Sequence, residues 1–295
     1  MRNWHRPWII AGYIGYAVAL FVLFTYLNFP SQQARAFVLT TLGRLGLHQV
    51  RIGAVQPLLP AGMTFKEVSV AHEVNGQRLE LVHVPALQVW LRRLPPFANP
   101  LRIGFGGGLY GGNILGAVEW QRNGQEPALG IRVDLQDIRP AAHPFVARLE
   151  NPLFEGKLTG NMTLRLSSAH WQDGNGRFTL QGAAGNIGSF EVKGVRLPSL
   201  TYEQLTGELV LQQRSLVVKE FSMRGRDWQL EAHGNVSLHQ DMLQSPLNLT
   251  IRVRASETLE QQLGMAGTFL KQRRDRRGFS AFKIGGTLER PQATL

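Results

Sequence analysis

The side chains best able to do chemistry in this sequence are its eight histidines and 21 acidic residues, and they form no recognised catalytic or metal-binding pattern. His233 and His239 would share one face of an extended strand, but at ~3.3 Å per residue they stand about 20 Å apart. His72 and His83 can meet only across a predicted turn, with few carboxylates nearby. Because no zinc-protease, nucleophile-elbow or phosphate-loop motif is present either, we expect no metal site.

A glycine-rich stretch without a phosphate-binding motif, and the absence of cysteine, exclude further classes of site. Residues 104–112 (GFGGGLYGG) contain a G-x-G but lack the helix and lysine of a phosphate-binding loop. They are better explained as a bent strand and a tight turn. The chain has no cysteine, so thiolate metal sites, iron–sulfur clusters and cysteine nucleophiles are excluded. We expect neither an enzyme nor a bound cofactor.

Positive charge is unevenly distributed along the chain. The formal charge of +11 is 32 basic minus 21 acidic residues, and no acidic residue precedes Glu67. The densest basic patch lies near the C-terminus and comprises Lys271, Arg273, Arg274, Arg276 and Arg277. It is either a solvated helix end or a contact for an acidic partner or lipid headgroups. No aromatic residues interleave it, so we do not expect nucleic-acid binding.

An uncharged segment near the N-terminus predicts a membrane anchor. As a helix, residues 8–29 would be about 33 Å long, enough to cross a hydrocarbon core of about 30 Å. A cleaved signal peptide would have a shorter apolar run and a small-residue cleavage site, and a buried core helix would also be shorter. Arg2 and Arg6 before the segment favour a cytoplasmic N-terminus. The residues expected in the membrane are Trp8, Ile9, Ile10, Tyr13, Leu20, Phe21, Phe24, Tyr26 and Phe29.

Residues 30–48 are predicted to form a short amphipathic connecting helix. Apolar side chains recur there at spacings of three and four, and Ser31 is a suitable N-cap. The helix carries Arg35 and Arg44 without acidic residues, so it would suit a surface of anionic lipid headgroups. Packing against the domain that follows is the equal alternative.

From residue 49 onward, apolar and polar residues alternate, which predicts strands with one dry and one wet face. Asn-Gly and Asp-Gly turn signals between the runs indicate hairpins, and we expect ten to twelve strands. Such strands build antiparallel sheets. The clearest apolar-face candidates are Trp228, Leu230, Val236, Leu238, Leu249, Ile251 and Val253.

Two later stretches look helical. Residues 139–150 allow a turn or two, and 256–272 predict one helix with Ser256 as N-cap. The fold class is therefore mainly β: an N-terminal transmembrane helix, then an antiparallel sheet with one or two short helices.

Three short motifs resemble a known family. Residues 57–68 (PLLPAGMTFKEV) resemble the opening of type II secretion system protein N, in its delta-proteobacterial form, and 109–114 (LYGGNI) resemble its Tyr-Gly-Gly strand start. The ending at 285–291 (GGTLERP) is similar to the close of AsmA-like envelope proteins. The resemblance implies a long, twisted antiparallel sheet curled into an AsmA-like trough with an apolar lining, and it supplies no catalytic residues.

The resemblance also implies a non-enzymatic accessory component of type II protein secretion, anchored in the bacterial inner membrane. Its expected partners are the membrane, crossed once, and other secretion-system proteins. The alternatives are an AsmA-like envelope protein that binds or transfers phospholipid, and an unrelated anchored binding module or enzyme. The expected segments are a cytoplasmic N-terminus (1–7), the anchor (8–29), the connecting helix (30–48) and a periplasmic β-rich domain (49–295).

Overall fold

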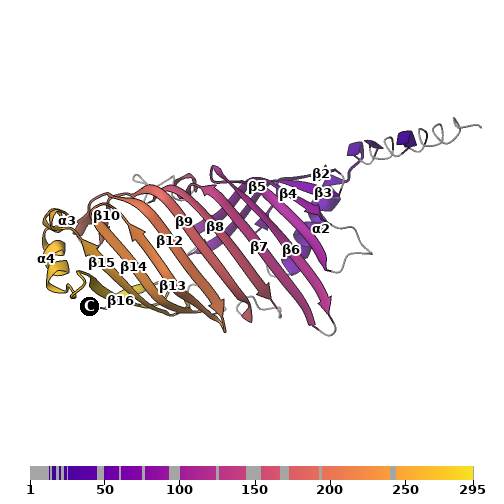
Figure 1. Ribbon diagram of the computed structural model, residues 1–295. Helices are drawn as coiled ribbons and strands as arrows, with labels where there is room; N and C mark the ends of the chain where they lie inside the picture. The colour runs from indigo at the N-terminus through magenta and orange to yellow at the C-terminus, as the bar shows by residue number, and fades with distance from the viewer. Residues whose placement is uncertain are drawn as a thin grey trace, which may run out of the picture.

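A single large antiparallel sheet dominates the chain (Figure 1). The computed structural model describes residues 26–44, 50–59, 61–74, 77–92, 100–123, 126–143, 154–166, 173–192, 195–239 and 244–294, with short pieces of 13–24. Within these ranges 15 strands join the large sheet, and β10 and β11 form a separate pair. The prediction of a mainly β chain with a long antiparallel sheet is confirmed.

The elements follow one another in the order of the chain. The first nine strands are β1 (Val50–Arg51), β2 (Ala54–Leu58), β3 (Gly62–Val74), β4 (Gln77–Leu91), β5 (Leu101–Leu109), β6 (Gly112–Asn123), β7 (Glu126–Ile138), β8 (Glu155–Leu166) and β9 (Asn175–Ile187). The others are β10 (Phe190–Val192), β11 (Val195–Leu197), β12 (Leu200–Gln212), β13 (Ser215–Arg224), β14 (Trp228–Ser237), β15 (Leu247–Ala255), β16 (Ser280–Gly286) and β17 (Pro291–Thr294). The described helices are α2 (Ser31–Arg44), the 3-10 turn η1 (Pro140–Ala142), α3 (Glu257–Gln262) and α4 (Met265–Gln272). The strands thus outnumber the ten to twelve expected.

The large sheet is a meander in which nearly every strand pairs with its neighbours in sequence. Its order runs from β1 through β3 to β9, then from β12 to β17, with β2 paired to β3. Consecutive pairing needs only short connections, which suits the closely spaced turn signals of the sequence. β1 and β17 end the path, so the sheet is open.

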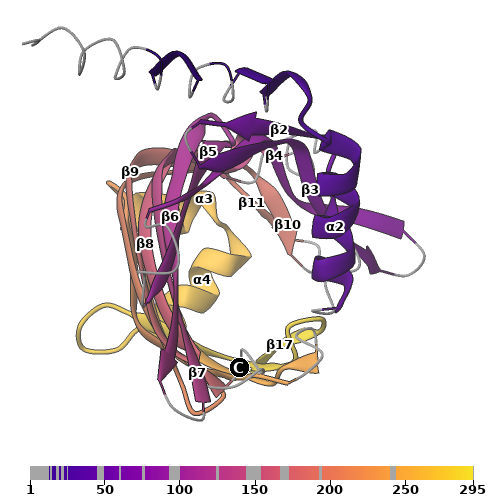
Figure 2. The ribbon, with the colours of Figure 1, turned by 90° about the vertical axis from the view of Figure 1, so that its right-hand side faces the viewer.

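The sheet curls around an axis that crosses its strands. Seen along that axis, the strands follow an arc that does not close, with α2 at one side and α4 within the curve (Figure 2). Right-handed twist accumulates from strand to strand, and a sheet of this many strands cannot stay flat. One face of every strand is consequently turned toward the inside of the arc.

Several hairpins turn without the Asn-Gly signal. Tyr110 and Gly111 have φ angles of 48° and 75°, and Gln213 and Arg214 have 49° and 59°. Two successive positive φ angles match a type I′ turn, whose twist suits a two-residue hairpin. The Tyr-Gly-Gly motif is therefore the turn between β5 and β6 and the start of β6.

The predicted helix over 256–272 is wrong in one respect, because two helices occupy that range. Ser256 caps α3 as expected, and its Oγ accepts a hydrogen bond from the Leu259 N–H at 3.3 Å. The break falls at Gly264, whose φ of 57° lies outside the helical region. In 139–150 only η1 is helical among the described residues.

Half of the predicted membrane anchor, eleven of the 22 residues in 8–29, falls outside the described residues, including Trp8, Ile9, Ile10 and Phe21. Tyr13, Leu20, Phe24 and Tyr26 are helical and exposed. Within the described ranges, the structure contains no helix with the length and apolar character needed to cross a membrane.

Candidate functional site

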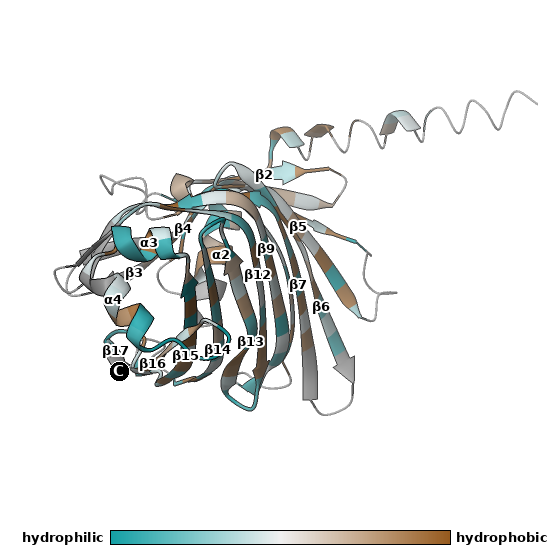
Figure 3. Cartoon of the chain, turned by 60° about the vertical axis from the view of Figure 1, so that its left-hand side comes forward, coloured by the Kyte–Doolittle hydropathy of each residue, from teal (hydrophilic) through white to brown (hydrophobic). Residues whose placement is uncertain are grey.

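The apolar residues of successive strands meet in register and form continuous rows across the sheet. One row runs from β16 to β3 through Ile284, Leu249, Gly234, Val218, Leu209, Phe178, Met162, Val133, Gly116, Phe105, Val89 and Met63. The next row runs through Phe282, Ile251, Ala232, Phe221, Gly207, Leu180, Gly160, Leu135, Ile114, Gly107, Leu87 and Phe65. We call the surface made by these rows the apolar face. Figure 3 shows the matching alternation of hydrophobic and hydrophilic residues along the strands.

The candidates named from the sequence lie on or beside this face. Leu249 and Ile251 belong to the two rows, and Leu230 pairs with Val253 in a neighbouring row. Val236 pairs with Leu247 and Leu216. All of the strand residues except Trp228 and Val236 stay partly exposed, namely Leu230, Leu249, Ile251 and Val253. Leu238 follows the end of β14 and is buried.

Helix α2 covers the apolar face at its N-terminal end. Val38 and Leu39 pack, together with Ala34, against a buried cluster of Ile52, Val55 and Phe65. Phe29, which was expected in the membrane, packs against the same cluster. Of the two alternatives for this helix, packing against the following domain is thus observed, while Phe37 points outward at 73% exposure. Ser31, which was expected to be the N-cap, is instead the first residue of the helix.

Helix α3 covers the apolar face at its C-terminal end. Leu259 packs on a buried cluster that contains Leu205, Met223 and Trp228. The Trp228 indole N–H donates to the Thr201 carbonyl oxygen at 2.7 Å. We call the face of β12 to β14 under α3 the covered section.

Tyr202 anchors the covered section to the strands beside it. Its side chain is 1% exposed, and its hydroxyl donates to the Glu155 carbonyl oxygen at 3.1 Å. Its ring stacks on Phe154 with a centroid distance of 5.4 Å. Burial raises the pKa of the Tyr202 hydroxyl above its ordinary value.

Between the two helices, most of the apolar face of β5 to β9 is partly exposed, except at one edge, where Leu109 and Ile138 are buried. We call it the open section. Trp120, on this face of β6, is 48% exposed. The neighbouring side chains are only half-buried, namely Ile103, Phe105, Val118, Ile131, Val133, Met162, Leu164 and Phe178. The cluster under α2 contains no residue of this section, whereas Leu158 on β8 and Leu180 on β9 adjoin the cluster under α3.

The opposite face of the open section is polar. Thr163, Arg165 and Arg177 alternate with apolar neighbours along β8 and β9 and are exposed. Arg177 pairs with Glu208 on β12 at 3.1 Å. Exposed ion pairs of this kind stabilise little, so this face is an ordinary solvated surface.

The C-terminal basic patch does not act as a unit. Arg274 pairs with Glu260, a residue only 8% exposed, and the Arg273 guanidinium lies 5.0 Å from the centre of the Phe269 ring. Lys271, Arg276 and Arg277 are exposed. Part of the patch therefore joins α3 and α4 to the chain that follows, while the rest is open to solvent.

Asp275 organises the segment between α4 and β16. Its carboxylate accepts hydrogen bonds from the backbone N–H groups of Phe279 and Arg277 at 2.9 and 2.8 Å, and from Arg252 at 2.9 Å. These hydrogen bonds, that from Phe279 foremost, lower the pKa of Asp275.

The residues considered for chemistry take structural positions. His83 approaches Glu67 at 3.4 Å, and no cluster of metal-binding side chains occurs in the described part of the chain. Ser280 and Lys283 have S-x-x-K spacing, but three residues apart on β16 they face opposite sides of the sheet. Gly104 lies under the Trp90 ring, which would be 2.6 Å from an added Cβ, so the glycine run is explained by close packing on β5.

None of the residues of the open section was among the apolar-face candidates named from the sequence. Their alternation is visible in 103–120, but glycines at 104, 106, 107 and 108 mask it. The signal becomes clear only when the register places the glycines of the apolar face opposite large side chains, as with Gly116 between Phe105 and Val133.

Comparisons of this chain with protein-family models, with curated proteins and with solved structures found no match. Any assignment of function must therefore rest on the geometry of the sheet.

Proposed function

We propose that the chain holds the acyl chains of lipids against the open section of its apolar face. The observation that carries this proposal is a continuous apolar surface that α2 and α3 cover at both ends and leave exposed between them. Contiguous exposed apolar surface of this kind is rare on soluble domains and marks a binding site. An acyl chain is the ligand whose shape and polarity match a long apolar strip.

The dimensions of the open section support this ligand. Five strands at ~4.8 Å spacing give a width of about 24 Å along the sheet. One leaflet of a bilayer is about 15 Å of hydrocarbon, half of the ~30 Å core. A lipid chain therefore fits between α2 and α3 when it lies across the strands.

The proposed setting is the bacterial envelope. A single N-terminal membrane span would hold the chain at the inner membrane, with the sheet in the periplasm. α2 follows the predicted span directly and packs on the sheet, so the N-terminal end of the apolar face would lie nearest the membrane.

The test compares one substitution on the two faces of β8. Met162→Glu puts a carboxylate on the apolar face of the open section, and Thr163→Glu puts it on the polar face one residue later. The full chain, purified in an uncharged detergent, is mixed with a fluorescent phospholipid, and bound lipid is quantified after gel filtration. We expect Met162→Glu to abolish lipid binding, because burying a charge against an acyl chain is strongly unfavourable. Thr163→Glu should bind as the unaltered chain does.

Circular dichroism of both variants establishes that they are folded. Equal lipid binding by the two folded variants, or no lipid on the unaltered chain by mass spectrometry, would refute the proposal.

The resemblance to type II secretion system protein N supplies a second proposal, an accessory role in protein secretion. The features that favour it are the two motifs at 57–68 and 109–114 that carry the resemblance. The same variants separate the two roles. If the chain acts only through protein contacts, Met162→Glu should leave secretion unchanged in cells.

A further inference from the structure

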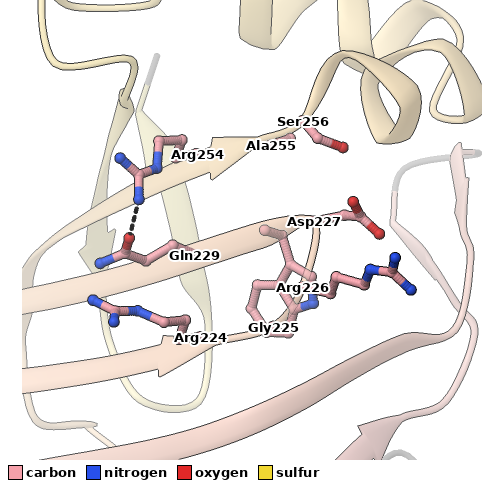
Figure 4. Close-up of a pocket in the computed structure, with 9 residues that line it drawn as sticks. Arg224, Gly225, Arg226, Asp227, Gln229, Arg254, Ala255 and Ser256 are labelled. Carbon is pink, nitrogen blue, oxygen red and sulfur yellow. Dashed lines mark hydrogen bonds between the residues drawn. The ribbon is translucent and has the colours of Figure 1, made fainter.

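A pocket of about 460 Å³ lies at the turn between β13 and β14, beside the start of α3. Its lining includes three arginines, Arg224, Arg226 and Arg254, and one acidic residue, Asp227. The formal charge of these four side chains is +2, three positive minus one negative. Figure 4 shows Arg224 and Arg254 on either side of Gln229, with Arg226 and Asp227 on the other side of the pocket.

The register of three strands brings two of the arginines together. Arg224 on β13 and Arg254 on β15 both pair with Gln229 on β14. Their Cα atoms are thus two strand spacings apart, about 9.6 Å at ~4.8 Å each. Arginine side chains are long enough for two guanidinium groups at this separation to contact one anion between them.

Arg254 and Gln229 are held in place by their neighbours. The Arg254 Nη2 donates to the Gln229 Oε1 at 2.6 Å, and the Gln229 Nε2 donates to the Glu231 Oε1 at 3.0 Å. The Arg254 guanidinium also lies 5.0 Å from the centre of the Phe279 ring. Because a guanidinium has five N–H donors, Arg254 keeps others for a ligand.

The turn that carries Arg226 is fixed as well. The Ser256 N–H donates to the Asp227 carbonyl oxygen at 2.7 Å, which joins the turn to the start of α3. An added Cβ at Gly225 would meet the Thr201 carbonyl oxygen at 2.3 Å, so the turn lies tightly against β12. A site held this firmly loses little entropy when it binds a ligand.

The arginines of the pocket differ from the neighbouring Arg252 in their ion-pair partners. Arg252, two residues from Arg254, has the carboxylates of Glu231 and Asp275 at 3.3 and 2.9 Å. By contrast, Arg224, Arg226 and Arg254 take part in none of the ion pairs found among the described residues. The pocket therefore has unbalanced positive charge and free donors.

We propose that this pocket binds a phosphate group, either a soluble phosphate or the phosphate of a lipid headgroup. Guanidinium groups bind phosphate oxygens through paired, charge-assisted hydrogen bonds. Arg224, Gln229 and Arg254 lie on the polar face of the sheet, opposite the apolar face. The proposal does not depend on lipid binding at the open section.

The test titrates the full chain in an uncharged detergent with inorganic phosphate, by calorimetry at constant ionic strength. The key variant is Arg224→Gln, because Arg224 is exposed. The matched control, Arg276→Gln, removes the same charge from an exposed arginine outside the pocket. We expect Arg224→Gln to weaken phosphate binding about tenfold or more and Arg276→Gln to change it less than about twofold.

A second titration distinguishes the two sources of phosphate by presenting phosphatidic acid in the same detergent micelles. If Arg224→Gln weakens the binding of inorganic phosphate and Arg276→Gln does not, the result supports a soluble phosphate as the ligand. If Arg224→Gln weakens binding only in the titration with phosphatidic acid, the result supports a lipid headgroup. Equal weakening in both variants would show a general charge effect and overturn the proposal. So would the absence of binding in both titrations to the unaltered chain, with its fold verified by circular dichroism.

Discussion

The covered and open sections of the apolar face are built from the same rows of residues and have different consequences. Under α3, Tyr202, Leu205 and Trp228 are between 1% and 7% exposed. On β8 and β9, Met162 and Phe178 continue the same kind of row and are only half-buried. A short helix accounts for the difference. Where the helix covers the apolar face, the apolar side chains stabilise the fold. Where no helix covers the face, the same kind of side chain remains free to bind a ligand.

The glycines of the two sections show how closely each is packed. At Gly185, an added Cβ would meet the Glu155 carbonyl oxygen and the Tyr202 hydroxyl at 2.2 Å each. At Gly116 on β6, in the open section, an added Cβ would meet the Phe105 ring at 2.2 Å and the Arg132 carbonyl oxygen at 2.6 Å. At Gly130, on the polar face of β7, its nearest neighbour would be the Glu119 Cβ at 3.7 Å. Close packing thus requires glycine both beside Tyr202 and in the open section, while Gly130 on the polar face has room for a methyl group.

The largest expected difference between the sections is in stability. Trp228→Ala should lower the free energy of unfolding by about 3–5 kcal/mol, because it leaves a cavity and removes a buried hydrogen bond. Phe178→Ala, in the open section, should lower it by about 1–2 kcal/mol, since the ring is already partly solvated. Urea unfolding of the full chain in an uncharged detergent, followed by circular dichroism, measures both. Similar losses would mean that the open section is closed in solution.

A smaller effect is expected from adding a methyl group. Gly185→Ala should destabilise the chain by about 1–3 kcal/mol, because neither the backbone oxygen nor the Tyr202 ring can move freely away. Gly130→Ala provides the control and should change stability by less than about 0.5 kcal/mol. The same unfolding measurement applies, and a tolerated Gly185→Ala would argue against the tight contact at Tyr202.

The smallest effect concerns pH. Because the pKa of Tyr202 is raised in the folded chain, the folded state retains its proton at a pH where the unfolded state has lost it. This contribution to stability is complete below the unfolded pKa of about 10 and is lost as pH rises through the folded pKa. Tyr202→Phe should therefore show a shallower fall in stability above pH ~10. Unfolding curves of both proteins at rising alkaline pH test this, and identical slopes would contradict it.

For some residues on the polar face, the alternation pattern does not predict the exposure or the contacts that the structure shows. Alternation makes Glu231 an ordinary solvated residue, yet its carboxylate accepts from Gln229 and pairs with Arg252. Gln229 is itself 8% exposed, although it alternates with apolar neighbours. These contacts join residues that are distant in sequence, such as Arg252 and Asp275, so no local pattern predicts them.

The sequence by itself determined that the chain forms an antiparallel meander, because period-two alternation and closely spaced turns allow few other arrangements. It also located the cap of α3 at Ser256, since capping depends on residues three apart. Only the tertiary structure decided the two helices in 256–272, the packing of α2 on the sheet, and the open section. Each of these depends on which helix reaches which strand, and on the register that sets Gly116 between Phe105 and Val133. Register and helix docking are set by contacts between distant segments, which a local pattern does not contain.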